Sequence, residues 1–166
     1  MNQETLTSIV NEALKKLYTI DLELVDRNLC ERCLVHRLAV HLGNSQLLQG
    51  YFIDCEFNRA FDKYENTLKY LSSDKGNYVD IIVHKRGIPI GDNLICMEVK
   101  KSSNTNRAAI EKDKRNLQIL TGEQYRYKLG VYINLGKTLE KSSISLYANG
   151  GQKTKDETSK LKYLRV

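Results

Sequence analysis

Three charged residues lie inside two apolar stretches of the chain. Asp80 stands in YVDIIV, and Glu98 and Lys100 stand two positions apart in NLICMEVKK. Side chains two positions apart on a strand point to the same face. Burying a carboxylate or an ammonium group costs free energy unless the group has a partner. The pattern therefore marks Asp80, Glu98 and Lys100 as candidates for one functional site.

The segment between the two stretches predicts how they pair. It contains Gly87, Pro89 and Gly91, which favour a turn and hence an antiparallel hairpin. If the turn centres on Pro89, Asp80 and Glu98 face each other, since each is nine positions from it. Facing carboxylates destabilise a sheet unless they share a proton or hold a cation. Carboxylate oxygens suit Mg²⁺, so a metal site and a proton-sharing pair both fit.

Glu31 is a third acid that the pattern brings toward these residues. It precedes Leu34 and Val35, the start of an apolar stripe on a helix expected over 28–42. Residues three and four apart share a helix face, so Glu31 is expected to point with the stripe toward the sheet. A simple favourable interaction with the helix dipole is the alternative explanation for an acid at this position.

The surrounding pattern predicts an α/β (α+β) fold. We expect helices over 3–18 and 28–42, the second capped by Asn28, and strands over 51–59, 78–85 and 94–100. A polar loop is expected over 60–77, a long helix from 104 or 105 that ends at Gly122, and strands near 127–135 and 143–149. The order α-α-β-β-β-α-β-β predicts a mixed sheet flanked by helices.

Composition bounds the class of protein. The chain has 166 residues, of which 41% are hydrophobic and 28% charged, which is typical of one globular domain. We therefore expect a single domain over 1–166, with a core at 28–135, an N-terminal helix at 3–18 and a C-terminal strand and tail at 143–166. The net charge of +6 suits a polyanion such as nucleic acid. Without an apolar run of membrane length or a signal pattern, we expect a cytoplasmic protein with no membrane partner.

The arrangement of Asp80, then Glu98-Val99-Lys100, after a helix bearing Glu31 resembles the PD-(D/E)XK nuclease superfamily and within it a compact, mostly bacterial subgroup. The resemblance implies a restriction-endonuclease-like core and a Mg²⁺ or Mn²⁺ ion held by Asp80, Glu98 and the Val99 carbonyl. Glu31 would assist the metal directly or through water. Lys100 would orient or activate the attacking water and stabilise charge on the phosphate. The family signature has a proline where this chain has a valine, at position 79.

The function implied by the resemblance is a metal-dependent nuclease, a hydrolase of phosphodiester bonds in DNA. Asn58, Arg59, Lys101 and Arg107 are candidate contacts to nucleic acid. Cleavage of both strands of a duplex would favour a homodimer, and a partner protein could supply targeting.

Two alternatives remain open from the residues. The first is a module of the same fold that binds nucleic acid or protein without cleaving it. The second is a thiol or zinc protein that uses Cys30 and Cys33, which have CxxC spacing but no second CxxC or His-x-x-x-His to complete a zinc site. His84, at the end of its strand, is expected on the surface.

Overall fold

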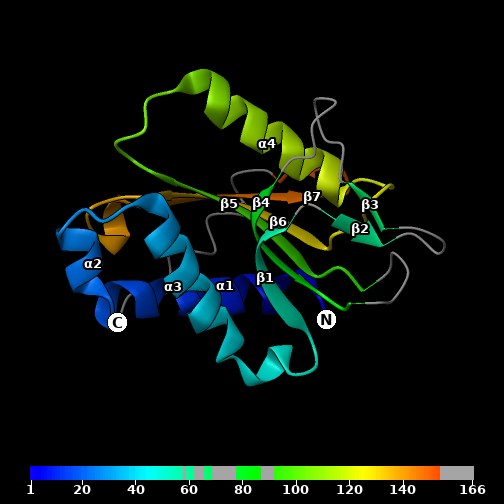
Figure 1. Ribbon diagram of the computed structural model, residues 1–166, viewed down its shortest axis with the longest axis horizontal. Helices are drawn as coiled ribbons and strands as arrows, with labels where there is room; N and C mark the ends of the chain where they lie inside the picture. The colour runs from blue at the N-terminus through cyan, green and yellow to red at the C-terminus, as the bar shows by residue number, and fades with distance from the viewer. Residues whose placement is uncertain (58, 62–65, 69–77, 87–91, 154–166) are drawn as a thin grey trace.

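The computed structural model describes residues 1–57, 59–61, 66–68, 78–86 and 92–153 (Figure 1). Within these ranges the chain forms a mixed α/β structure around a six-stranded mixed sheet. Helices α1 and α3 lie on one side of this sheet and α4 lies on the other, which gives three layers (Figure 1). The α/β class predicted from the sequence is confirmed.

Four α-helices and two short 3₁₀ turns are present in the described part of the chain. They are α1 (Gln3–Thr19), α2 (Leu22–Asp26), α3 (Glu31–Gly43), η1 (Gln46–Leu48), α4 (Arg107–Thr121) and η2 (Leu139–Lys141). Two asparagines define helix starts: Asn2 accepts a hydrogen bond from the Thr5 N–H, and Asn106 accepts one from the Ala109 N–H. Such caps satisfy N–H groups that have no partner inside the helix.

The strands are β1 (Phe52–Phe57), β2 (Arg59–Phe61), β3 (Asn66–Leu68), β4 (Val79–His84), β5 (Ile95–Lys101), β6 (Leu129–Leu135), β7 (Ser143–Ala148) and β8 (Gly151–Gln152). The large sheet has the order β1-β4-β5-β6-β7-β8, and β2 pairs with β3 in a separate sheet. The β5–β6 pair is parallel and its neighbours are antiparallel. Helix α4 makes the crossover that a parallel pair requires.

The predicted register of the β4–β5 hairpin is confirmed. Ile82 pairs with Cys96, and the flanking pairs run from Ile81 with Met97 to Val83 with Ile95. The same register continued by one position places Asp80 opposite Glu98. The hairpin therefore brings the two carboxylates together as the sequence predicted.

Two hydrophobic cores decide which way the residues of β5 point. Met97 and Val99 pack into the core beneath α1 and α3, whereas Cys96 packs into the core beneath α4. Because strand residues alternate between faces, Glu98 and Lys100 lie on the α4 side of the sheet. These two residues therefore lie between the sheet and α4.

Several predicted boundaries were wrong. Helix α3 begins at Glu31, after Cys30, and not at Asn28. Asn28 lies just beyond α2, a helix that the sequence did not predict, and has a left-handed backbone with a φ of 56°. An asparagine suits both a helix cap and a left-handed position, so its type alone could not distinguish the two. The expected loop at 60–77 contains β3 and part of β2.

Candidate functional site

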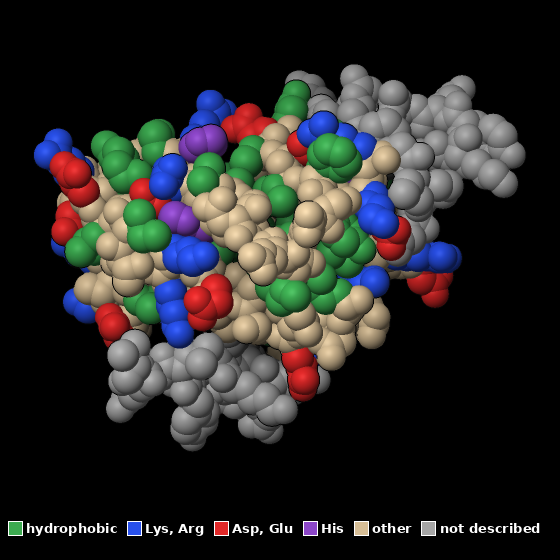
Figure 2. Space-filling model, turned by 90° about the horizontal axis from the view of Figure 1, so that it is seen from below, with side chains coloured by type: hydrophobic (Ala, Val, Ile, Leu, Met, Phe, Trp, Pro, Cys, Tyr) green, Lys and Arg blue, Asp and Glu red, His purple; other side chains and the backbone are tan. Residues whose placement is uncertain are grey.

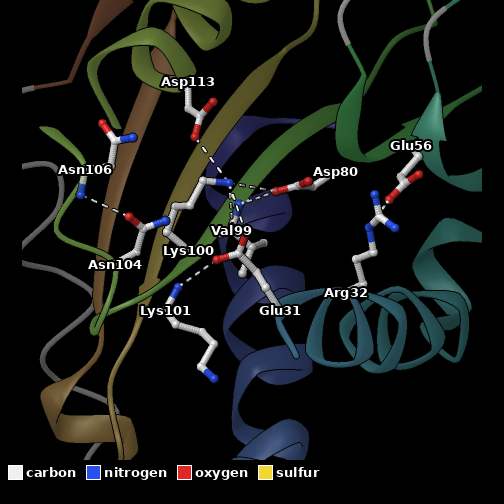
Figure 3. Close-up of polar contacts among 10 residues, drawn as sticks. All are labelled: Glu31, Arg32, Glu56, Asp80, Val99, Lys100, Lys101, Asn104, Asn106 and Asp113. Atoms are coloured by element: carbon white, nitrogen blue, oxygen red, sulfur yellow. Dashed lines mark hydrogen bonds and ion pairs between the residues drawn. The ribbon is translucent and has the colours of Figure 1, made fainter. Parts of the chain in front are cut away.

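Lys100 is the centre of the candidate site. Its Nζ lies 3.2 Å from Glu31 Oε1, 3.3 Å from Asp113 Oδ2 and 3.9 Å from Asp80 Oδ2. The three acids come from α3, α4 and β4, and Figure 3 shows them arranged around the ammonium group. The side chain of Lys100 is only 14% exposed. One buried cation thus joins three elements that are far apart in the sequence.

Asp80 lies at the point where β4 separates from β5. The last pair of this ladder is Ile81 with Met97, and the next strand N–H, that of Val99, donates to Asp80 Oδ2 at 2.8 Å. A side-chain oxygen thus replaces a backbone carbonyl as the partner. Val79 and Ile81 also pack into different cores although they are two positions apart, so the alternation of β4 breaks at Asp80. This local irregularity directs the Asp80 carboxylate toward Glu98 and Lys100.

A second irregularity lies on the neighbouring strand. Glu56 in β1 has a φ of 50°, which is uncommon for a residue with a side chain. Phe57, which pairs with Val79, packs with the α4-side core, whereas Ile53, four positions before it, packs with the core beneath α1 and α3. The two breaks lie beside each other in the sheet, and such breaks re-aim side chains.

Glu98 is the most deeply buried acid of the site. It is 3% exposed, and its Oε1 has no hydrogen-bond partner among the described residues. Burial, followed by the negative charges of Asp80 and Asp113, raises its pKa well above the usual value. The same environment lets a protonated Glu98 share a hydrogen bond with Asp80. A buried acid with an unpaired oxygen indicates a place for a proton or a cation.

Glu31 points to the sheet, as predicted. Its Oε1 binds Lys100 Nζ and its Oε2 accepts the backbone N–H of Lys101 at 3.1 Å. Both carboxylate oxygens therefore have partners at the end of β5. In this arrangement Glu31 holds Lys100 and the carboxyl end of β5 in place.

Asp113 is a site residue that the sequence reasoning missed. It lies on α4 between Lys112 and Lys114, on the helix that also carries Arg107, a candidate nucleic-acid contact. Yet Asp113 precedes Leu117 by four positions and Leu120 by seven, and both leucines are buried. That spacing places Asp113 on the inward face and could have identified it.

The electrostatics of the site favour a protonated lysine. Burial alone would lower the pKa of Lys100, but the charges of Asp80, Asp113 and Glu31 outweigh it and raise the pKa. Burial is also the main cause that raises the pKa values of Asp80 and Asp113. Lys100 can therefore donate hydrogen bonds and offer positive charge, but it is a poor proton acceptor.

The donor atoms that a metal ion would use are oxygens. Asp80 and Glu98 supply carboxylate oxygens. Val99 supplies a backbone carbonyl oxygen, which lies 3.3 Å from Lys100 Nζ. In the described ranges, His, Cys, Asp and Glu side chains form no group of three that could hold a metal ion. A metal at this position would thus take two carboxylates, a backbone carbonyl and water, a set that Mg²⁺ uses in proteins.

The candidate nucleic-acid contacts are only partly placed. Asn58 lies outside the described residues, and Arg59 begins β2. Lys101 turns back to the segment between α2 and α3, since its Nζ donates to the carbonyls of Asn28 and Leu29. Arg107 is exposed at the start of α4. On the face seen in Figure 2, basic and acidic side chains are interspersed, so the positive charge does not gather there.

Two cysteines and an arginine lie around the start of α3. Cys30 precedes the helix, and its Sγ lies 3.0 Å from that of Cys33; both cysteines are exposed. The Cys33 thiol is the main cause that lowers the pKa of Cys30. Arg32 forms an ion pair with Glu56, with 2.9 Å between Nε and Oε1. Figure 3 shows this pair beside the Lys100 cluster.

The prediction that His84 lies on the surface was wrong. It is 3% exposed, and its Nε2 lies 2.8 Å from Asp54 Oδ2. Arg86 also binds the Asp54 carboxylate. This group is on β1 and β4 at the end away from Asp80, so it belongs to the packing of the sheet edge and not to the Lys100 cluster.

Comparison of the chain with models of protein families, with curated protein sequences and with solved structures found no match. Among the described residues, none of the helices has the length and apolar character that crossing a membrane requires.

Proposed function

We propose that this chain is a divalent-metal-dependent nuclease that hydrolyses phosphodiester bonds in DNA. The observation that carries the proposal is the convergence of Asp80 and Glu98 across the β4–β5 hairpin, with Lys100 next to them. Acids packed this closely raise each other's pKa values and destabilise the fold. Proteins retain such arrangements chiefly at functional sites.

The site is suited to a cation. Glu98 Oε1 is buried without a hydrogen-bond partner in the described part of the chain, and Asp80 lies beside it. Asp80, Glu98 and the Val99 carbonyl would hold Mg²⁺ or Mn²⁺, because these hard cations prefer oxygen ligands. When bound, the cation supplies positive charge at the phosphate and lowers the pKa of water.

The protein's own groups would orient the reactants. Water attacks phosphorus, the ester P–O bond breaks, and the leaving oxygen takes a proton, which yields a phosphate monoester and a hydroxyl group. Protonated Lys100 is placed to donate to the attacking water or to a phosphate oxygen and to stabilise the added negative charge. Glu31 and Asp113 would keep the ammonium group in position. Because its pKa is raised, Lys100 is not the base in this proposal.

The architecture supports the resemblance to the PD-(D/E)XK nucleases. A helix bearing Glu31 precedes β1, β4 and β5, and α4 leads from β5 to the parallel strand β6. This is the order that a restriction-endonuclease-like core has, with β2 and β3 inserted after the first strand. Val79 stands where the family signature has a proline. It is buried and is the first residue of β4, directly before Asp80.

The proposal is tested with supercoiled plasmid DNA incubated with Mg²⁺ or Mn²⁺. Asp80→Asn keeps an oxygen that can accept the Val99 N–H but removes the charge, so cleavage should be lost while the fold is kept. Asp92→Asn is the matched control, since Asp92 is a half-buried acid that pairs with Lys85 outside the site. Equal cleavage by the wild type and Asp80→Asn would rule out the assignment.

One observation favours a second candidate, a module that binds nucleic acid or protein without cleaving it. The Lys100 ammonium already neutralises part of the acidic cluster and joins α3, α4 and the sheet. A network of this kind can be purely structural. Calorimetric titration with Mn²⁺ separates the two candidates. A binding heat that Asp80→Asn abolishes supports the nuclease, and its absence together with DNA binding supports the module.

A further inference from the structure

Cys30 and Cys33 bracket the first turn of α3, which is the part of that helix that reaches the candidate site. Their sulfur atoms are 3.0 Å apart and both side chains are exposed to solvent. Cys30 occupies the N-cap position, next to the N–H groups of the first turn, and its side chain makes no cap hydrogen bond. Helix N-termini stabilise thiolates, and exposed cysteine pairs with CxxC spacing are the ones that react reversibly.

The two residues between the cysteines connect the start of α3 to two strands of the sheet. Glu31 binds Lys100 Nζ and the Lys101 N–H, and Arg32 binds Glu56, the β1 residue with the left-handed backbone. Figure 3 shows the Glu31 side chain pointing to Lys100 and the Arg32 side chain pointing to Glu56.

The segment before Cys30 is tied to the same place. The Nζ of Lys101 donates to the carbonyl of Asn28 at 3.1 Å and to that of Leu29 at 2.9 Å. The backbone on both sides of Cys30 is thus connected to the end of β5. A change in the geometry of the cysteine pair would be transmitted to Lys100 and Lys101 through these contacts.

We propose that Cys30 and Cys33 form a reversible dithiol–disulfide switch that controls how Glu31 holds the end of β5. In the reduced form Glu31 makes its contacts with Lys100 and Lys101. Formation of the disulfide weakens these contacts. The effect of the switch on DNA cleavage rests on the proposed function, whereas the thiol chemistry and its effect on Glu31 do not.

The oxidant in this proposal is a low-molecular-weight disulfide such as glutathione disulfide. The Cys30 thiolate attacks one sulfur of that disulfide, an S–S bond forms, and one glutathione leaves as thiolate and takes up a proton. The Cys33 thiol then loses its proton and attacks Cys30 Sγ, which releases the second glutathione. The two protein thiols are oxidised to one disulfide and one glutathione disulfide is reduced to two thiols.

The expected structural effect follows from the distances. A disulfide bond is about 2.05 Å long, so the two sulfur atoms must approach by about 1 Å from their separation of 3.0 Å. The first turn of α3 has to adjust around Glu31. The bond from the Lys101 N–H to Glu31 is already 3.1 Å, so a shift of about 0.5 Å, half of the sulfur displacement, is enough to take it beyond hydrogen-bond range.

The test measures the disulfide and the Lys101 amide separately, on the full chain without metal or DNA. The protein is equilibrated with mixtures of reduced and oxidised glutathione, and mass spectrometry follows the loss of two hydrogens from the peptide that holds both cysteines. Amide hydrogen exchange of Lys101 is then followed by NMR in both forms. We expect the amide to exchange about tenfold faster in the oxidised protein, since one hydrogen bond to a charged group is lost.

Two serine variants provide the controls. Cys33→Ser cannot close the disulfide, so its Lys101 exchange should not respond to glutathione disulfide. Cys55→Ser removes another exposed cysteine and should behave as the wild type. Formation of only a mixed glutathione adduct at Cys30, or a disulfide that leaves Lys101 exchange unchanged, would overturn the proposal. Because neither readout uses DNA, a failed switch is distinguishable from a failed nuclease assignment.

Discussion

The Val99 backbone N–H donates to Asp80 Oδ2 at 2.8 Å, at the position where β4 and β5 stop pairing. This bond takes the place of a ladder hydrogen bond between the two strands. It holds the Asp80 carboxylate between the strands and beside Glu98. It also links the Asp80 carboxylate to the backbone of the Glu98-Val99-Lys100 segment, which fixes its position relative to that segment.

Asp80→Asn should separate structure from metal binding. The amide oxygen can still accept the Val99 N–H, so the unfolding midpoint in urea should change little. The affinity for Mn²⁺ should fall at least about 100-fold. Loss of a group that only orients a metal ligand can lower the affinity by that factor, and loss of the ligand itself should cost no less. Calorimetric titration measures the change. An Mn²⁺ affinity equal to that of the wild type would exclude Asp80 as a ligand.

Glu98→Gln should stabilise the metal-free protein. Glu98 is buried next to Asp80 and Asp113, and its pKa is raised by burial first and by those charges second. Replacing it with a neutral isostere removes this repulsion, so in EDTA at pH 7 the free energy of unfolding should rise by about 1 kcal/mol. Urea denaturation checks it, with Glu111→Gln on the exposed face of α4 as the control.

The sign of the pH dependence follows from the same shift. A carboxyl whose pKa is higher in the folded state than in the unfolded state favours folding when it is protonated. The stability that protonated Glu98 contributes is present below its unfolded pKa of 4.5. It is lost as the pH rises through the raised pKa of the folded state. The stability gained by Glu98→Gln should therefore increase with pH. A gain that is constant from pH 4 to pH 8 would contradict this account.

Asp113→Asn tests the site residue that only the structure revealed. Lys100 keeps Glu31 and Asp80 but loses one of its three acidic neighbours. We expect kcat for plasmid cleavage to fall about tenfold or more, as for other groups that orient a functional side chain. The affinity for Mn²⁺ should be nearly unchanged. A loss of Mn²⁺ affinity equal to that of Asp80→Asn would instead place Asp113 at the metal.

Asp21 offers a stability test away from the site. Burial would raise its pKa, but hydrogen bonds from Arg37 at 2.9 Å and His41 at 2.5 Å outweigh it and lower the pKa below 3.8. An acid with a lowered pKa stabilises the fold above its unfolded pKa, and this contribution is lost as the pH falls through the folded value.

Asp21→Asn should therefore cost about 1–3 kcal/mol at pH 7 and lose less stability than the wild type on acidification below pH 4. Urea denaturation at a series of pH values measures both effects. Parallel stability curves for the wild type and the variant would show that the Asp21 group does not stabilise the fold as described.

The sequence predicted the hairpin of the candidate site well because the chemistry there is local. A turn of glycine and proline residues separates two apolar strands, which leaves few registers for Asp80 and Glu98. Glu31 was placed correctly because its helix carries a clear apolar stripe. These predictions needed only the geometry of one strand pair and one helix.

Other features were missed or had no local signature. Asp113 was missed because α4 is charged over most of its surface and the inward position is visible only with Leu117 and Leu120 as references. The left-handed backbone of Glu56 and the break in β4 at Asp80 have no signature in residue type. They depend on how β1, β4 and β5 pair, which is a property of the assembled sheet.

The most direct test of the account is a crystal structure of the protein soaked in Mn²⁺, with anomalous diffraction to locate the ion. We predict one anomalous peak in contact with Asp80, Glu98 and the Val99 carbonyl, and no peak there in crystals of Asp80→Asn. A peak elsewhere, or none at a saturating Mn²⁺ concentration in the wild type, would contradict the claim that these carboxylates form a metal site.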